Sequence, residues 1–400
     1  MGFADAIQWL LKYATYLGVT AATGGVFLLY FYQNSLIYPA NFPTGSRTVV
    51  ATPDEAGMPE YENLTITTRD NVKIKAYYIP YRKASEAKES EGGLRNRTES
   101  QNGEIADTTV LYCHANAGNM GHRLPIARVF HTRFKTNVVM FSYRGWVMGN
   151  AALGGSHIDS PTFLVSLCRY GTSEGSPSEK GLKIDAQATL NWILAHPQLK
   201  HTKIVVYGQS IGGAVAINLA ATNQEHIAAL IVENTFLTLR KLIPFVMPMI
   251  RYFTFLCHQI WDSEAAIKTI PKMPIMLLSG GRDELIPSEQ MLALCCAARN
   301  ARGRPHVSGK EETFETDRND VRFVVFPNGT HNETCVQPGY FDAVLAFWNT
   351  FVVGNGSPDG ARTSSGTVPH AVPRKGAEGL VDAVKAVQKG GAGANSHVGL

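Results

Sequence analysis

Short apolar runs alternate with longer amphipathic segments through the middle of this chain. The runs fall at residues 109–113, 138–143, 203–208, 228–233, 274–280 and 322–326. Strands of a parallel sheet are buried on both faces, so they read as continuous apolar runs. The pattern therefore predicts an α/β fold, a mostly parallel sheet with helices on both faces. Alternating positions at 61–67 and 72–79 predict an antiparallel hairpin before it.

The pattern changes at both ends of the chain. Residues 13–32 contain no charged side chain, and a helix of twenty residues is long enough to span a bilayer. A tyrosine stands at each end of this stretch. A cleaved signal peptide is the alternative, although the apolar part is long and no small-x-small site closes it. We expect residues 1–35 to be a membrane anchor, 36–353 a catalytic domain, and the Gly-, Ser- and Pro-rich residues 354–400 a flexible tail.

One glycine-flanked serine is the strongest chemical signal. Gly208-Gln209-Ser210-Ile211-Gly212 follows an apolar run and precedes a helix-like segment, which is the context of a nucleophile elbow. A turn this sharp requires small neighbours, and glycine fits both positions. The N–H group of Ile211 would then begin an oxyanion hole at the helix start.

A serine nucleophile needs a histidine base and a carboxylate that orients it. Asp283 follows the apolar run 274–280, and His331 follows the run 322–326, so both are placed at carboxyl ends of strands. The order serine, acid, histidine is the one expected for such an elbow. Glu233, after the run 228–233, is an alternative acid, whereas Asp262 reads as a solvated helix residue.

The loop after the first parallel strand is predicted to complete the oxyanion hole. His114-Ala115-Asn116 follows the run 109–113, and enzymes with this elbow take a second N–H donor from such a loop. Asn116 is the candidate donor. We interpret His114 as a brace for the loop that takes no part in the chemistry.

Composition narrows the function further. The formal net charge is +4, without a basic and aromatic stripe, so nucleic acid is not an expected partner. Six cysteines are scattered, which indicates neither a zinc site nor a disulfide framework. No phosphate-binding glycine loop and no metal-binding helix motif is present, so we expect catalysis without a cofactor or metal.

Several of these motifs together resemble those of the fungal bud-emergence hydrolases (the Bem-forty-six type) and of related animal membrane proteins with an α/β-hydrolase domain. The resemblance covers most of the chain. Its motifs include the elbow, Tyr143-Arg144-Gly145, and the loops that carry His114, Asp283 and His331. It implies an α/β-hydrolase fold tied to a membrane by one N-terminal helix, with Ser210, Asp283 and His331 as the triad.

Two segments need separate interpretation. Residues 146–169 interrupt a place where the family continues directly from Tyr-Arg-Gly to Tyr-Gly, and we interpret them as a translated intron or as an additional lid. Residues 236–262 are rich in Leu, Phe, Met and Pro and lie where lids over acyl pockets are built, although simple packing also explains them.

We therefore expect a single-pass membrane protein of the endoplasmic reticulum or plasma membrane that hydrolyses carboxylic esters or thioesters through an acyl-serine intermediate. An anchored site favours lipid-like or fatty-acylated substrates, with membrane lipid as the surrounding partner. The alternatives are a serine peptidase with the same triad and a non-catalytic scaffold in cell polarity or membrane organisation. Nothing in the pattern indicates an oligomeric state.

Overall fold

The computed structural model describes residues 2–39, 50–83, 103–116, 118–145, 173–303 and 320–354. The segment 146–169 and the tail beyond residue 354 lie outside the described residues, so the interpretations given to them stay predictions.

The central sheet has eight strands in the order β1-β2-β4-β3-β5-β6-β7-β8. β1 and β2 form the predicted antiparallel hairpin, β2 also runs antiparallel to β4, and all later pairs are parallel. Each apolar run found in the sequence is a strand. The bounds are β1 (Glu62–Thr67), β2 (Lys73–Ile79), β3 (Thr108–Cys113), β4 (Asn137–Phe141), β5 (Lys203–Gln209), β6 (Ile227–Glu233), β7 (Ile275–Gly280) and β8 (Val321–Phe326).

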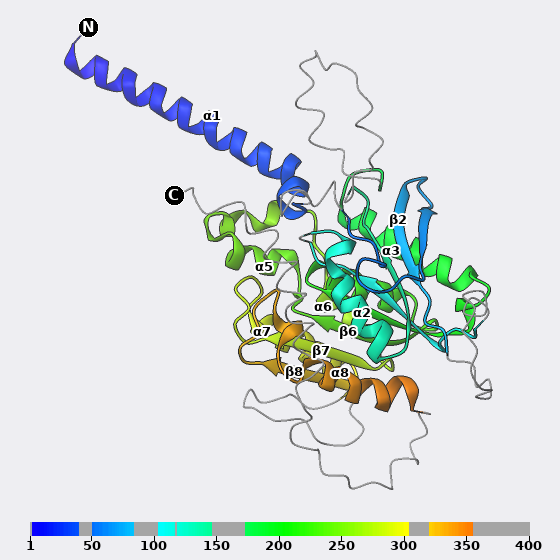
Figure 1. Cartoon of the computed structure of the whole chain (residues 1–400). Coiled ribbons are helices and arrows are strands. Elements are labelled where there is room, and N and C mark those ends of the chain that lie inside the picture. The colour runs from blue at the N-terminus through cyan, green and yellow to red at the C-terminus, as the bar shows by residue number, and fades with distance from the viewer. Residues whose placement is uncertain are drawn as a thin grey trace, which may run out of the picture.

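Helices cover both faces of this sheet (Figure 1). In the described part of the chain the α-helices are α1 (Phe3–Ile37), α2 (Leu124–Arg133), α3 (Glu179–Ala195), α4 (Ile211–Thr222), α5 (Leu239–Val246), α6 (Ser263–Lys268), α7 (Ser288–Asn300) and α8 (Tyr340–Trp348). The 3-10 helices are η2 (Met120–Arg123), η5 (Leu199–His201), η6 (Pro248–Leu256) and η7 (Thr334–Val336), and η8 (Asn349–Val353) is a π-helix.

Side chains along the central strands point alternately to the two faces of the sheet, and this divides the hydrophobic core into two parts. Leu111 and Val206 pack on the face covered by α3, α4 and α7, while Val110 and Tyr207 pack on the face covered by α2 and α8. Successive side chains of a strand point to opposite faces, so a strand buried on both faces must be apolar at every position. This explains why the parallel strands were visible in the sequence as unbroken runs.

The strand order also positions the site. β3 neighbours both β4 and β5, so the chain winds outward in opposite directions from the β3–β5 pair. At such a switch point the loops that follow the two strands separate and leave a crevice at their carboxyl ends. The His114 loop follows β3 and Ser210 follows β5, which places both at this crevice.

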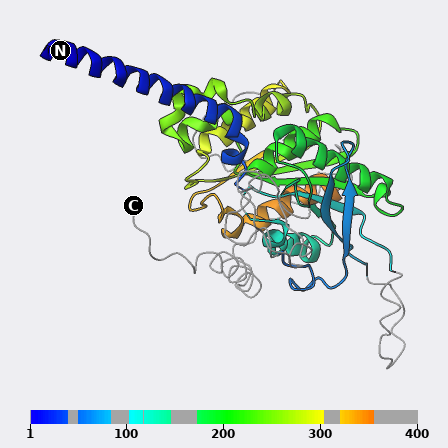
Figure 2. The same ribbon diagram turned by 90° about the horizontal axis from the view of Figure 1, so that it is seen from above.

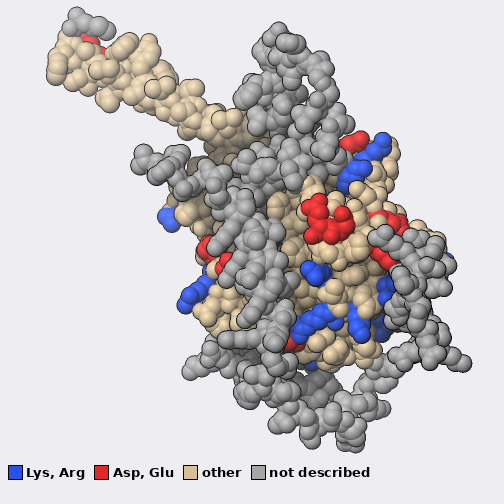
Figure 3. All heavy atoms as spheres, in the orientation of Figure 1, with Lys and Arg blue, Asp and Glu red and all other residues tan. Residues whose placement is uncertain are grey.

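Helix α1 projects from the body of the molecule in two views (Figures 1 and 2). It is the one helix of the described residues that is long and apolar enough to cross a membrane, and its most apolar stretch is not buried against the protein. On the face seen in Figure 3, charged atoms of α1 occur only near its free end. Its other end is attached to the domain, where Gln33 and Tyr38 are buried.

Arg144, part of the Tyr-Arg-Gly motif, has a structural role in the core. Its Nη2 lies 2.8 Å from Asp185 Oδ1 in α3, and its Nη1 lies 2.7 Å from Asp70 Oδ2 in the turn between β1 and β2. Its backbone N–H also donates to Asp185 Oδ2 at 2.8 Å. The side chain thereby joins α3 to the antiparallel hairpin. Burial raises the pKa of Asp185 to about 6, even with Arg144 beside it.

Replacement of Arg144 by methionine should lower the free energy of unfolding by about 3–5 kcal/mol, because Asp185 would stay buried without its cation. The folded-state pKa of Asp185 lies above the value of about 3.9 expected in the unfolded chain, so the cost of its charge grows as pH rises through the folded-state value. The loss should therefore be larger at pH 8 than at pH 5, as measured by denaturant unfolding in detergent.

The matched control is Arg133→Met, which removes a partly exposed arginine paired with Asp342 at the surface. Exposed pairs contribute about 0–1 kcal/mol, so this variant should unfold almost like the wild type. Equal losses in the two variants, or a loss at Arg144 that does not change with pH, would contradict the role assigned to Asp185.

Candidate active site

Ser210 occupies the sharp turn between β5 and α4. Its backbone has φ 57° and ψ −123°, a region that residues with a side chain rarely adopt. A Cβ atom at Gly208 would lie 2.2 Å from the carbonyl oxygen of Gly212, and one at Gly212 would lie 2.2 Å from that of Cys113. Both flanking positions are therefore closed to any side chain, as the sequence pattern predicted.

His331 and Asp283 lie in line with this serine. His331 Nε2 is 3.0 Å from Ser210 Oγ, and His331 Nδ1 is 2.9 Å from Asp283 Oδ2. The side chains of His331 and Asp283 are only 6% and 1% exposed. Because the carboxylate faces Nδ1, that nitrogen carries the proton and Nε2 is left to accept one from the serine hydroxyl. Three residues that are distant in the sequence thus form one chain of hydrogen bonds.

Backbone groups hold the carboxylate in position. Asp283 Oδ1 accepts hydrogen bonds from the N–H groups of Leu285 at 2.9 Å and Ile286 at 2.8 Å. Glu284 Oε2 in turn accepts the N–H of His331 at 3.1 Å. The two loops after β7 and β8 are therefore joined through both the ring and the backbone of His331.

Glu233, the alternative acid, occupies another place. Its carboxylate is fully buried and accepts hydrogen bonds from the hydroxyl groups of Tyr207 and Tyr340. Burial raises the pKa of Glu233. Gln209 Nε2 lies between Glu233 Oε1 and the carbonyl oxygen of His331, 3.2 Å from each. Glu233 thus supports the backbone of the histidine loop, whereas Asp283 bonds the ring.

Two supporting residues could not be singled out from the sequence. Asn234 Nδ2 donates to the carbonyl oxygen of His331 at 3.1 Å, and Asn234 Oδ1 accepts the N–H of Gly280 at 2.8 Å. Asn234 and Gln209 thus both hold the backbone of the loop that carries His331. Their only sequence signal is a polar residue beside a strand end, which many loops share. Asp262, by contrast, is the exposed N-cap of α6 and bonds Ala265 N at 2.9 Å.

The loop after β3 lies opposite the serine. His114 Nδ1 is 2.7 Å from the carbonyl oxygen of Ala115, and its ring packs against Tyr143 at a centroid distance of 4.3 Å. Burial lowers the pKa of His114 to about 3, so the ring is neutral and its structural role agrees with the sequence interpretation.

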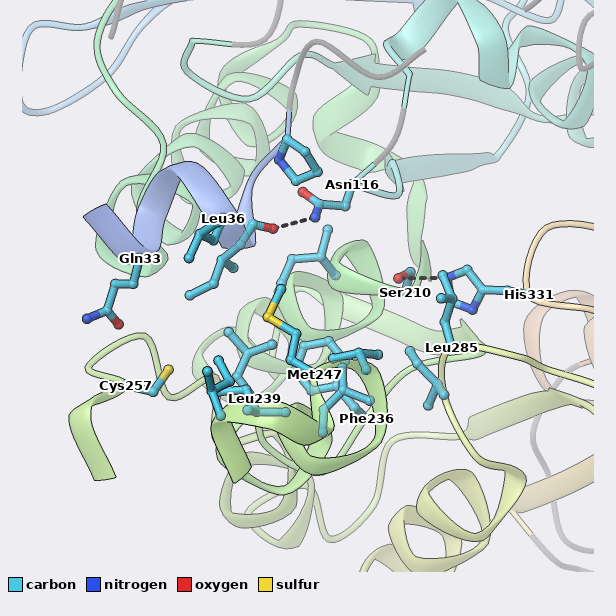
Figure 4. A pocket seen from close by; sticks show the side chains of 18 of the residues that line it. Gln33, Leu36, Asn116, Ser210, Phe236, Leu239, Met247, Cys257, Leu285 and His331 are labelled. Carbon is cyan, nitrogen blue, oxygen red and sulfur yellow. Dashed lines mark hydrogen bonds between the residues drawn. The ribbon is translucent and has the colours of Figure 1, made fainter. Parts of the chain in front are cut away.

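The candidate oxyanion donors Ile211 and Asn116 both line the pocket that contains Ser210. The side chain of Asn116 points away from the serine, because its Nδ2 donates to the carbonyl oxygen of Ile37 at 2.5 Å (Figure 4). This bond ties the loop to the end of α1. The backbone N–H of Asn116 is therefore the group that remains a candidate for the oxyanion hole.

An apolar pocket of about 360 Å³ opens beside Ser210 and His331. Its size is that of a site for a small organic ligand. Figure 4 shows Phe236, Leu239 and Met247 facing Leu36 of α1 across this space. We call residues 239–256, which comprise α5 and η6, the cap segment. One wall of the pocket therefore comes from the cap segment and another from the N-terminal helix.

Within the described residues, no group of three or more His, Cys, Asp or Glu side chains is arranged to hold a metal ion. The described cysteines Cys113, Cys257, Cys295, Cys296 and Cys335 are free thiols.

Comparison with known proteins gives the family. Residues 108–254 match the model of the alpha/beta hydrolase fold, and residues 187–355 match that of the C-terminal region of BAAT / acyl-CoA thioester hydrolases. A solved structure, the esterase Pf2001 of Pyrococcus furiosus, superposes with a TM-score of 0.50 at 20% identity, over 76% of this chain and 95% of that one. At that identity the likeness supports the fold alone.

Two curated relatives extend over nearly the whole molecule. Protein bem46 of Schizosaccharomyces pombe is 40% identical over 348 residues, which are 86% of this chain and 95% of that protein. The uncharacterized membrane protein YNL320W of Saccharomyces cerevisiae is 34% identical over 82% of this chain and 93% of its own. The chain therefore belongs to the bem46-type family of α/β-hydrolases.

Proposed function

We propose that this protein is a membrane-anchored serine hydrolase that cleaves carboxylic esters or thioesters of lipid-like or fatty-acylated substrates. The observation that carries the proposal is the hydrogen-bonded chain from Ser210 through His331 to Asp283 at one end of an apolar pocket. The family matches support hydrolysis of ester or thioester bonds.

The geometry supports each step of the proposed acyl transfer. Ser210 Oγ attacks the acyl carbonyl carbon while His331 Nε2 takes the hydroxyl proton. The ring then returns this proton to the departing alkoxide or thiolate, and the acyl group stays on the serine. Water repeats the sequence: His331 removes its proton, the oxygen attacks the acyl-serine, and the carboxylic acid leaves as Ser210 regains its hydrogen.

Two kinds of group stabilise the charges that develop. The Asp283 carboxylate faces His331 Nδ1 and stabilises the imidazolium that forms. The N–H groups of Ile211 and Asn116 are the proposed donors to the tetrahedral oxyanion, with the start of α4 adding its dipole.

The apolar lining of the pocket favours an acyl chain over a small polar group. Its lining is almost entirely aliphatic and aromatic, with Gln33, Asn116 and the serine–histidine pair among the few polar contributions. Each methylene that leaves water contributes about 0.8 kcal/mol, or roughly a fourfold gain in affinity. A chain that enters this pocket therefore strengthens binding until the space is full.

Hydrolysis should show this dependence on chain length. With p-nitrophenyl esters and acyl thioesters from two carbons upward, held below their micelle concentrations, kcat/KM should rise by roughly fourfold per methylene until the pocket is filled. Leu239→Trp, which fills part of the pocket, should shorten the preferred chain. Val325→Trp, at an exposed position on β8, is the matched control and should not.

Other outcomes of the same assay identify other functions. A preference for acetyl over every longer chain would contradict the lipid-like substrate. Cleavage of aminoacyl amides alone would favour a peptidase, and a folded protein without any hydrolysis would favour a scaffold.

We propose that α1 anchors the protein in the endoplasmic reticulum or plasma membrane as a single span over residues 13–32. This stretch carries no charge and lies within the candidate spanning helix. The full chain should stay in the membrane pellet after alkaline carbonate washing. Replacement of Leu17 and Leu28 by arginine should release it, whereas the exchange of both for isoleucine should not. Release of the wild type by the wash would contradict the anchor.

A further inference from the structure

The 3-10 helix η6 of the cap segment presents two different apolar stripes. Side chains three positions apart lie above one another in a 3-10 helix. Ile250, Phe253 and Leu256 form one such row and line the pocket. The neighbouring row consists of Met249, Tyr252 and Phe255, which do not line the pocket. Their side chains are 93%, 72% and 67% exposed, respectively. We call this row the outer stripe.

Three large exposed apolar side chains in a row require an apolar neighbour, because such patches on soluble surfaces mark contacts with a protein or a membrane. A positive charge also lies beside the outer stripe. The Arg251 guanidinium lies 4.7 Å from the centre of the Tyr252 ring, and its Nη2 donates to the Tyr252 hydroxyl at 2.6 Å. An aromatic ring beside a basic group is suited to the boundary between acyl chains and lipid phosphates.

The position of the cap segment relative to α1 identifies this neighbour. Gln33 Nε2 donates to the carbonyl oxygen of Leu256 at 3.2 Å, and Gln33 Oε1 accepts the N–H of His258 at 2.9 Å. The ring of Tyr30 packs on that of His258 at 5.4 Å. Figures 1 and 2 both show the α5 region beside the inner end of α1. The end of the proposed span is thus attached directly to the cap segment.

The length of α1 leaves no room for a gap between this segment and the bilayer. Twenty residues of helix rise about 30 Å, the thickness of the hydrocarbon core. Because the proposed span ends at Tyr32, where the polar residues Gln33, Asn34 and Ser35 follow, and Gln33 is already bonded to the cap segment, less than one helical turn separates them. The surface nearest to α1 must therefore meet the membrane.

We propose that the outer stripe is inserted into the lipid leaflet beside α1, and that the pocket receives its acyl chain directly from that leaflet. The second half of this inference rests on the proposed function. The pocket wall includes Leu29, which lies within the uncharged stretch, while Ser210 and His331 lie at the catalytic end. An acyl chain can therefore pass from the bilayer to the serine between α1 and the cap segment without crossing bulk water.

Fluorescence tests the insertion on the full chain in nanodiscs of phosphatidylcholine and phosphatidylserine. Cysteine is introduced at Met249 or, as a control, at Val353, which is 61% exposed at the far end of η8. Cys168 and Cys296 are replaced by serine, and the new thiol carries an NBD group. At position 249 the emission should shift to the blue and be quenched by doxyl-labelled lipid. At position 353 it should be quenched by aqueous iodide. Equal, iodide-accessible emission at both positions would overturn the proposal.

Kinetics test the route of the substrate. Met249→Ser, Tyr252→Ser and Phe255→Ser are combined in one variant, and Val325→Ser with Val353→Ser is its surface control. The outer-stripe variant should hydrolyse a long-chain ester embedded in the nanodiscs at least about tenfold more slowly than the wild type. Hydrolysis of a soluble butyrate ester should be unchanged in both variants. An equal loss on the two substrates, or no loss on either, would overturn the route through the leaflet.

The two measurements also separate this inference from the proposed function. If the wild type hydrolyses neither substrate but position 249 is buried in lipid, the proposed function fails and the insertion stands. If both esters are cleaved but position 249 is exposed to water, the hydrolase stands and the insertion is wrong.

Discussion

Ser210→Ala should abolish covalent labelling by a fluorophosphonate probe and reduce ester turnover by about six orders of magnitude. The probe reacts with a serine that a histidine activates, and Ser210 Oγ lies 3.0 Å from His331 Nε2. Loss of the nucleophile removes the acyl-enzyme route, and only oxyanion stabilisation and binding remain. The substitution removes one oxygen without adding bulk, so the elbow and the thermal unfolding temperature should persist.

The matched control for this variant is Ser279→Ala, which removes another buried hydroxyl from the neighbouring part of the sheet in β7. It should retain both labelling and turnover. Labelling of the Ser210 variant at the wild-type rate would show that another residue is the nucleophile. A folded wild type that is never labelled would favour the scaffold.

Asp283→Asn should lower kcat by about 10⁴-fold with little change in stability. An amide nitrogen opposite His331 Nδ1 would donate a hydrogen bond there, which drives the ring proton to Nε2. The histidine then faces Ser210 with a proton and cannot accept another. Steady-state turnover of a short ester, together with the rate of fluorophosphonate labelling, measures this effect.

Glu233→Gln is the control that separates the two candidate acids. It changes a buried carboxylate whose bonds go to Tyr207, Tyr340 and Gln209, with its influence on His331 passing through the backbone. Turnover should fall by less than about tenfold, because the tautomer of the ring is unaffected. A 10⁴-fold loss in this variant, with Asp283→Asn nearly active, would identify Glu233 as the acid.

The sequence alone determined the strands of the sheet and the chain order of the candidate triad. Strands buried on both faces are apolar along most of their length, so the runs now seen as β3 to β7 were visible without a structure. The glycine at position 208 follows equally from local geometry, since a Cβ atom there would lie 2.2 Å from the carbonyl oxygen of Gly212 in the same turn. Such features depend on neighbours in sequence or on the period of a strand, and both are written in the residue pattern.

The tertiary structure decided what depends on the path of a loop. Asp283 and Glu233 both follow buried strands, and only the turn through Leu285 and Ile286 aims one of them at the histidine ring. Arg144 was recognised in the sequence as part of a family motif, but its role in the core became visible only from its ion pair with Asp185 of α3. Helix α1 also adds one wall to the pocket. The carbonyl oxygen of its Ile37 accepts a hydrogen bond from the side chain of Asn116, 79 positions further along the chain. No local propensity encodes such contacts, because they exist only after the packing of the helices and the sheet has brought the segments together.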